Sequence, residues 1–176
     1  MGDILMGIWS PNAPGRPILL LCHMDTVWPV GTLPDQVPIR QDEDRFYGPG
    51  ALDMKAGIVI AIEAIRALQV LGQMPQRPIY MMVTTDEETG SHHSRQIILE
   101  TAAECALTLV MEPAAQDNEG LKTWRKGIGN YTITARGKAS HAGAAPEEGV
   151  NAVVELAHQT IALHSLNALR QALQSA

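Results

Sequence analysis

A histidine and an aspartate separated by one residue are the first side chains in the sequence that could do chemistry together. His23 and Asp25 directly follow an apolar run, residues 18–22. In an extended backbone this spacing places both side chains on one face. The imidazole could then bind a metal ion while the Asp25 carboxylate fixes its tautomer. An ordinary surface His–Asp pair is the alternative, and this short pattern alone does not exclude it.

Carboxylates at three further places could join this pair. Asp53 comes just before a long apolar stretch, where an aspartate often serves only as a helix N-cap. Asp86, Glu87 and Glu88 follow a second apolar run, and adjacent carboxylates repel one another unless a cation lies near. Their ordinary role would be to cap the following helix. Glu112 follows a third apolar run, where a lone glutamate is commonly a solvated strand end.

The shared position of these residues favours one metal site over several unrelated explanations. If the three apolar runs are parallel strands, their carboxyl ends open on one crevice. One histidine with several carboxylates suits a divalent ion. The excess of oxygen ligands indicates two ions that share a carboxylate, for which Asp53 is the candidate. Because the side chains of Glu87 and Glu88 diverge, we expect one to bind metal and the other to act as general base.

The elements that must position this site alternate between strand and helix, as in an α/β sandwich. Short runs with almost no charge have the composition of buried parallel strands. A longer apolar stretch that ends at Gly72 predicts a largely buried crossover helix. The predicted elements are parallel strands at residues 18–22, 79–84 and 107–111, helices at 56–71 and 94–103, and edge strands at 2–9 and 44–47.

A different pattern begins near Leu121. Two strand-like stretches surround Gly127 and Gly129, a loop with glycine and proline follows, and the last stretch predicts a helix. These elements lie at residues 123–126, 130–135, 137–149 and 151–164. Two strands and one helix are too few to close a core, so we predict a second domain that is incomplete or borrows a partner.

Composition excludes several classes of function. The 176-residue chain is 45% hydrophobic, yet no apolar run reaches the roughly 18 residues of a membrane span. Its net charge is −6 and its 13 basic residues are scattered, so we expect neither nucleic acid nor a membrane as a partner. Cys22 and Cys105 form no CxxC pair, which predicts small buried residues. The N-terminus lacks a secretory signal, so cytoplasmic is the default location unless truncation has removed a signal.

Five motifs resemble those of the M20 zinc metallopeptidases, especially the glutamate carboxypeptidase group. In chain order they are His23-Met-Asp-Thr-Val, Gly48-Pro-Gly-Ala-Leu-Asp53, Thr85-Asp-Glu-Glu-Thr-Gly90, Met111-Glu-Pro113 and Gly137-Lys-Ala-Ser-His-Ala-Gly143. The resemblance implies a partial three-layer α/β/α catalytic domain over residues 1–118, the start of an α+β lid and dimerisation domain over 119–165, and a divergent tail over 166–176. It also implies truncation at both ends, without one metal-binding histidine and the groups that grip the substrate carboxylate.

The resemblance further implies the ligands of two Zn2+ ions, with Co2+ or Mn2+ as alternative metals. His23 and Glu112 would bind different ions, Glu88 would bind one of them, and Asp53 would bridge the pair. The peptide bond between Asp53 and Met54 would be cis, as in many relatives.

Three other residues would take part in the reaction. Glu87 would be the general base, and Asp25 would steady the imidazole of the metal-binding histidine. His141 in the lid would reach the active site of the neighbouring subunit and steady the oxyanion there, which implies a homodimer through the lid. His92 and His93 are not expected to be ligands, since the family does not use those positions.

The implied reaction is the hydrolysis of an amide by water activated at two zinc ions. The substrate would be a small peptide or an N-acyl amino acid, and the product a C-terminal amino acid, with glutamate as one candidate. Aminoacylase, deacetylase and dipeptidase activities use the same chemistry and are alternatives. A non-catalytic remnant that binds metal or oligomerises is a further alternative, because one ligand and the substrate clamp are missing.

Overall fold

In the computed structural model, a four-stranded mixed sheet lies between two helices within residues 1–123. In spatial order its strands are β1 (Leu5–Trp9), β5 (Ile79–Thr84), β2 (Ile18–His23) and β6 (Leu107–Val110). β2 runs parallel to β5 and to β6, which confirms the three predicted parallel strands. β1 pairs antiparallel with β5 at one edge of the sheet, as predicted for residues 2–9.

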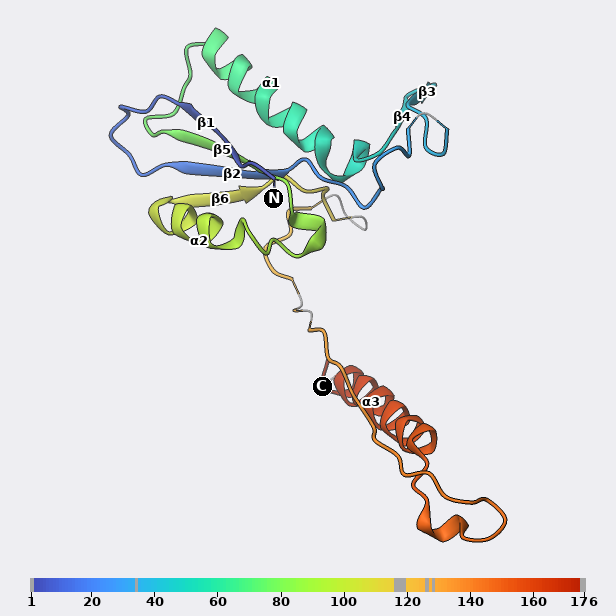
Figure 1. The fold of residues 1–176 in the computed structure, drawn as a ribbon. Helices are drawn as coiled ribbons and strands as arrows, with labels where there is room; N and C mark the ends of the chain where they lie inside the picture. The colour runs from blue at the N-terminus through green and yellow to red at the C-terminus, as the bar shows by residue number, and fades with distance from the viewer. Residues whose placement is uncertain (1, 34, 116–119, 126, 128, 175–176) are drawn as a thin grey trace. The chain divides into compact units, whose positions relative to one another are not determined.

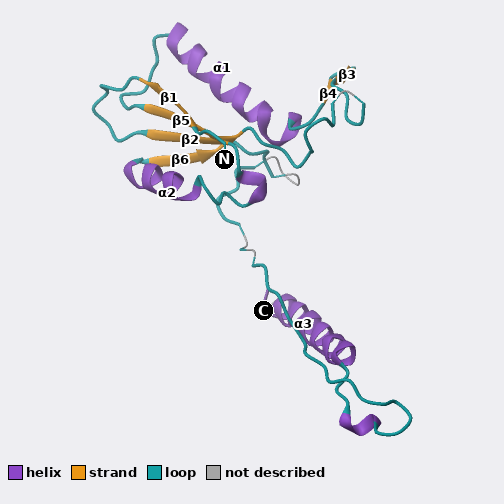
Figure 2. Cartoon of the chain, viewed as in Figure 1, coloured by secondary structure: helices purple, strands orange, loops and turns teal. Residues whose placement is uncertain are grey.

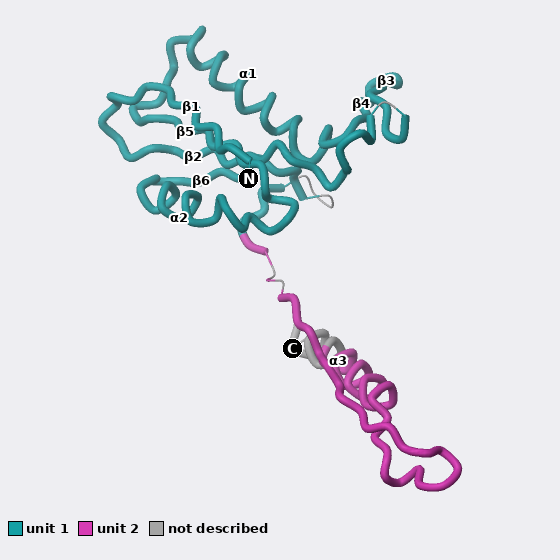
Figure 3. The backbone as a smooth tube through the Cα atoms, viewed as in Figure 1, with its two compact units in different colours: residues 1–123 teal, residues 124–176 magenta. Residues whose placement is uncertain are grey.

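The structure describes residues 2–33, 35–115, 120–125, 127 and 129–174, with side chains up to residue 166. The chain divides into two compact units, residues 1–123 and 124–176 (Figure 3). The predicted boundary between residues 118 and 119 lies outside the described residues. Among those that are described, none of the helices combines the length and the apolar character that crossing a membrane requires.

Two helices cover opposite faces of the sheet (Figures 1 and 2). They are α1 (Ala56–Val70) and α2 (Arg95–Glu104), close to the predicted positions. Side chains alternate across a strand, so Leu20 and Cys22 of β2 pack in the cluster that α1 joins, while Leu19 packs in the cluster on the α2 side. The predicted three-layer α/β/α arrangement is therefore confirmed for this part of the chain.

The prediction that α1 is largely buried is wrong. Only Ala61 and Ile65 of this helix are buried, whereas the side chains of Ile60 and Val70 are 61% and 87% exposed. The sequence is apolar around most of the helix, and that composition suggested burial on every side. A helix that packs on one face of a sheet buries only one stripe, and here no second layer among the described residues covers the outer stripe.

The predicted strand at residues 44–47 exists but does not join the central sheet. It is β4 (Arg45–Tyr47), which pairs antiparallel with β3 (Arg40–Asp42) in a separate two-stranded sheet. The Arg40 guanidinium lies 3.8 Å from the centre of the Tyr47 ring across this hairpin. The predicted edge strand is therefore present, and it pairs with a local strand that is only a two-residue turn away. Glu43 in that turn adopts a positive φ of 52°.

The second unit contains fewer strands than predicted. Among the described residues of the segments 123–126 and 130–135 no strand is formed, and Lys126 lies outside the described residues. The backbone pairs instead at an isolated bridge between Lys138 and Val150, next to a short 3₁₀ turn η3 (Pro146–Glu148). Tyr131 is 91% exposed, which fits a segment whose sequence favours a strand but which finds no strand to pair with among the described residues.

The last helix, α3 (Ala152–Gln174), starts where the sequence predicts and ends later. Its start is fixed by Asn151, whose side-chain oxygen accepts hydrogen bonds from the backbone N–H groups of Val153 and Val154. The predicted end near His164 is wrong because no glycine or proline interrupts the residues that follow. The helix therefore continues through most of the segment predicted as a tail.

Candidate metal centre

The carboxyl ends of the three parallel strands bring the candidate residues together. His23 is the last residue of β2 and is only 2% exposed. Glu87 and Glu88 open a 3₁₀ turn, η2 (Glu87–Thr89), that follows β5. Glu112 comes shortly after β6. Asp53 lies in a kinked segment, η1 (Ala51–Lys55), that leads into α1, and its own backbone angles are not helical.

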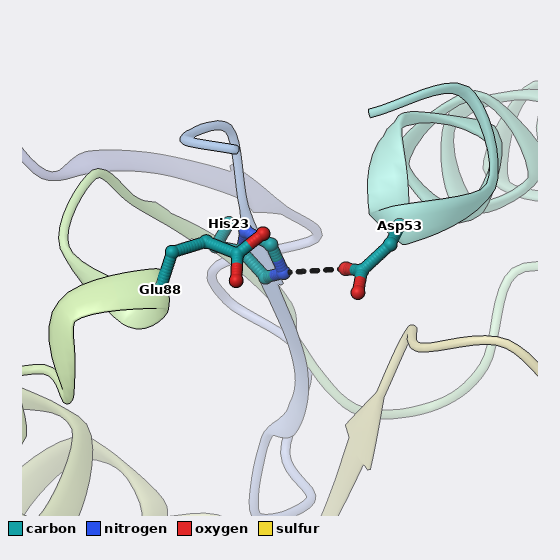
Figure 4. Close-up of side chains that lie close together, drawn as sticks. All are labelled: His23, Asp53 and Glu88. Carbon is teal, nitrogen blue, oxygen red and sulfur yellow. Dashed lines mark hydrogen bonds and ion pairs between the residues drawn. The ribbon is translucent and has the colours of Figure 1, made fainter. Parts of the chain in front are cut away.

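The ring of His23 is surrounded by carboxylates on its Nε2 side. Nε2 lies 3.0 Å from Oδ1 of Asp53, 3.1 Å from Oε1 of Glu112 and 3.9 Å from Oε2 of Glu87. Figure 4 shows Nε2 directed at the Asp53 carboxylate, with the side chain of Glu88 reaching toward the same ring. A single histidine thus contacts acids that come from three different elements.

These donor atoms fit a divalent cation. One ligand atom each from His23, Asp53 and Glu88 can be chosen so that all lie within 4.8 Å of one another. Donor atoms in a tetrahedral zinc site are roughly 3.3 Å apart, close to the 3.0 Å between His23 Nε2 and Asp53 Oδ1. A neutral imidazole with several oxygen donors is also a chemistry that zinc accepts. The residues present therefore match the metal that the sequence predicts.

Asp25 lies on the opposite side of the His23 ring. Nδ1 of His23 is 3.2 Å from the backbone oxygen of Asp25 and 3.4 Å from its Oδ1. Oδ2 of the same carboxylate accepts a hydrogen bond of 2.9 Å from the backbone N–H of Glu88. With Nδ1 held in this way, Nε2 is the nitrogen that faces the acidic cluster.

The charges of the site shift two pKa values in the protein without metal. Burial lowers the pKa of His23, but the nearby carboxylates of Glu87, Glu112 and Asp25 outweigh burial, so the net shift is upward. Burial also raises the pKa of Glu87, and Glu112 adds to this while the charge of His23 opposes it. The upward pKa shift of His23 comes from the surrounding negative charge, whereas that of Glu87 comes first from burial and then from the neighbouring carboxylates. A bound cation would neutralise the negative charge.

Asp86, His92 and His93 do not belong to this cluster, and His141 is part of the second unit. Asp86 has the ordinary capping role, because its Oδ2 accepts the backbone N–H groups of His93 and Ser94 before α2. His93, like His92, is exposed and is not part of the acidic cluster. His141 belongs to the second unit, where its Nδ1 accepts the backbone N–H of Gly143 at 3.2 Å in an exposed turn.

The buried cysteine next to His23 is not poised as a nucleophile. Cys22 is 2% exposed, and Cys105 is 6% exposed, as predicted for both cysteines. Burial raises the pKa of Cys22 to about 11, with a smaller contribution from Glu112. A thiol with this pKa is almost wholly protonated at neutral pH, and only the thiolate is nucleophilic.

The site has two further features, a hollow that the sequence did not predict and a cis peptide bond that the family resemblance implied. A hollow of about 210 Å³ lies beside Asp53 and Glu88, and its walls include Thr26, Trp28 and Leu52. The peptide bond between Asp53 and Met54 is cis, as the family resemblance implied.

Solved structures share this fold. The aminopeptidase PepT from Bacillus cereus superposes with a TM-score of 0.59 at 22% identity, over 88% of this chain and 41% of that one. Human carnosine dipeptidase 1 gives a TM-score of 0.52 at 19% identity, over 63% of this chain and 27% of that one. At these identities the likeness concerns the fold.

Sequence relatives are more similar. Carboxypeptidase G2 from Pseudomonas sp. (strain RS-16) is 39% identical over 155 residues, which cover 88% of this chain and 37% of that protein. Acetylornithine deacetylase from Proteus mirabilis (strain HI4320) is 30% identical over 164 residues, covering 89% of this chain and 39% of that protein. The chain thus spans less than two fifths of the length of these two relatives.

A family model also matches most of the chain. The sequence pattern of Peptidase family M20/M25/M40 matches residues 19–172. This range includes all the strand-end acids, most of the second unit and most of the segment predicted as a divergent tail. The chain therefore belongs to Peptidase family M20/M25/M40.

Proposed function

We propose that this chain carries most of the metal centre of a hydrolase that cleaves an amide bond and releases a C-terminal amino acid. One observation carries the proposal: Nε2 of the buried His23 contacts the carboxylates of Asp53 and Glu112. A carboxylate oxygen of Glu88 also lies within 4.8 Å of ligand atoms of His23 and Asp53. The substrate would be a small peptide or an N-acyl amino acid. The 39% identical relative that bears the name carboxypeptidase supports this substrate class, with glutamate as one candidate product.

The ligands are assigned from the contacts around His23. Asp53 is the carboxylate proposed to be shared by two zinc ions, with Glu88 on the second ion. Glu112 lies 3.1 Å from the same nitrogen that Asp53 contacts, which favours Glu112 on the ion of His23. This assignment replaces the separate ions that the resemblance implied. When bound, the ions would polarise the amide carbonyl and make water more acidic.

Glu87 is the proposed general base. Its Oε2 lies 3.9 Å from Nε2 of His23, so its carboxylate faces the same space as the ligands without being the nearest of them. Its raised pKa brings it closer to the pH at which it must both accept and return a proton. Oε2 would take a proton from the attacking water and deliver it to the leaving amine. Asp25 would hold the ring of His23 and the backbone of Glu88 during these steps.

The hollow beside the metal centre is the proposed position of a substrate group next to the scissile amide. Asp53 and Glu88 form one side of it, and the apolar side chains of Trp28 and Leu52 form part of the rest. His141 of the second unit is proposed to act at the site of a neighbouring subunit in a homodimer. That role rests on the motif alone.

Two other functions have specific support. Relatives named acetylornithine deacetylase are 29% to 30% identical, which favours hydrolysis of a short N-acyl group as the first alternative. The second is a chain that binds metal without turnover, which the contacts around His23 would equally allow. In that case the same ligands would bind zinc and no amide would be hydrolysed.

Equilibrium dialysis with Zn2+, together with an assay for amino acid release, tests the proposal. We expect Asp53→Asn to lose bound zinc, and Glu87→Gln to keep zinc but lose any release of glutamate from an N-acyl glutamate. Glu100→Gln is the matched control, since Glu100 is exposed on α2 and bonds only to Gln96 among the described residues. Failure of the wild-type chain to bind zinc would refute the metal centre. Zinc binding without release would support the non-catalytic alternative.

A further inference from the structure

A buried thioether accepts a hydrogen bond from the backbone of the proposed metal ligand His23. The N–H of His23 lies 3.0 Å from Sδ of Met54, and both residues are almost completely buried. Met54 is 0% exposed and packs in the core cluster between the sheet and α1. A methionine sulfur is a weak acceptor, so it rarely serves where a carbonyl is within reach.

The sheet explains why this N–H needs an acceptor from elsewhere. The pairing of β2 with β6 ends at Leu21 and Val110, followed by one more hydrogen bond from the N–H of Met111 to the carbonyl of Leu21. Beyond that point the chain leaves the ladder to place Glu112. His23 therefore lies beyond the last residue of β2 that pairs with β6, and the Met54 sulfur accepts the hydrogen bond that β6 does not.

Met54 is also joined directly to a second proposed ligand. Its backbone follows Asp53, whose Oδ1 lies 3.0 Å from Nε2 of His23. The methyl group of Met54 reaches α1 beside Gly57, so the side chain is held at both ends. Two ligands from different elements, β2 and η1, are thus connected through one side chain that does not contact the metal position.

We propose that Met54 is a positioning residue of the metal centre, which fixes the backbone of His23 relative to Asp53. The inference rests on the proposed metal-binding function and goes beyond it. Without the sulfur, the buried N–H of His23 would have no partner, and the strand end could shift until it found one. Such a shift would move the imidazole away from Asp53 and weaken metal binding while leaving the packed core in place.

The test compares two methionines that are equally buried. Met54→Leu keeps an apolar side chain of similar size and removes the acceptor, while Met82→Leu makes the same change in the other core cluster, where Met82 is also 0% exposed. We expect Met54→Leu to weaken Zn2+ affinity about tenfold, as loss of an outer-shell partner typically does. Met82→Leu should leave the affinity unchanged, and both variants without metal should keep a cooperative urea unfolding transition.

Amide hydrogen exchange of the metal-free wild type gives a second readout that needs no variant. The His23 N–H should exchange slowly, like the N–H of Met111 in the ladder, although it lies past the last strand pair. Fast exchange at His23 would overturn the inference even if Met54→Leu failed to fold. Unchanged zinc affinity in a folded Met54→Leu would also overturn it and leave the metal centre intact. If the wild type bound no zinc, the proposed function would fail and this inference with it.

Discussion

The Asp25 carboxylate accepts the backbone N–H of Glu88 at 2.9 Å while its second oxygen lies 3.4 Å from the ring of His23. The two contacts connect the end of β2 with the turn that follows β5. Asp25 is 18% exposed at its side chain, so both contacts are largely shielded from water. One carboxylate thus contacts two proposed ligands, at the ring of His23 and at the backbone of Glu88.

Replacement of Asp25 by asparagine should therefore weaken metal binding. Asp25→Asn keeps the shape but removes the charge that faces Nδ1, and we expect Zn2+ affinity to fall about 10- to 100-fold. Competition with a chromophoric chelator measures this change. Asp42→Asn is the control, because Asp42 is exposed on the hairpin and pairs only loosely with Arg40 at 3.7 Å. Equal affinities of Asp25→Asn and wild type would show that Asp25 does not orient the ligand.

If His23 and Glu112 bind the same ion, as proposed, the losses of bound zinc caused by replacing each of them should not add. If both bind one ion, His23→Gln and Glu112→Gln should each remove the same zinc, and the double variant should lose no more than either alone. Bound zinc per chain after dialysis measures the outcome. Separate ions would instead give a double variant that loses one ion more than each single variant. Glu63→Gln is the matched control, since Glu63 pairs with Arg66 on the surface of α1.

The strands and the place of the site could be predicted because they depend on local composition. Residues 79–84 are apolar on both faces, a composition typical of strands in a parallel sheet that helices cover on both sides. The carboxyl ends of such strands always meet at one edge, so His23, Glu88 and Glu112 could be placed together without knowing any distance.

The features that could not be predicted depend on partners distant in the sequence. The exposure of Ile60 on α1 depends on what covers that face, and the pairing of Tyr47 depends on which strand lies nearest in space. The contact between the His23 N–H and the Met54 sulfur requires β6 to leave the ladder at one particular residue. No periodicity or motif in the sequence encodes that event.

Stability of the metal-free chain should fall as the pH rises. The folded pKa of His23 is raised above its usual 6.5, so its stabilising charge is fully present below about 6.5 and is lost as pH passes the raised value. Glu87 acts in the same direction, because its folded pKa is raised above 4.5 and its ionised form is penalised in the fold. We expect a higher urea midpoint at pH 6 than at pH 8.5.

Zinc should reverse this dependence. The ion competes with the proton on His23, so the stabilisation that zinc adds should grow between pH 6 and pH 8.5. His23→Gln should flatten the pH dependence of the metal-free chain, whereas His158→Gln, on the exposed surface of α3, should leave it unchanged. A metal-free wild type that becomes more stable toward pH 8.5 would contradict the assignment of the shift to His23.

Gly57 permits the close approach of α1 to the chain that carries Glu112. A methyl group added at Gly57 would lie 2.0 Å from the backbone oxygen of Met111, and a backbone atom cannot give way as a flexible side chain can. Gly57→Ala should therefore destabilise the fold by about 1–3 kcal/mol or more, measured by urea unfolding. Gly127→Ala is the matched control, because an added methyl group there meets no atom within 4 Å among the described residues.

Since relief of the clash must move Met111, and Glu112 is bonded to it, Gly57→Ala should also weaken zinc binding. A loss of stability with unchanged zinc affinity would mean that α1 moves instead, and that the position of Glu112 does not depend on this contact.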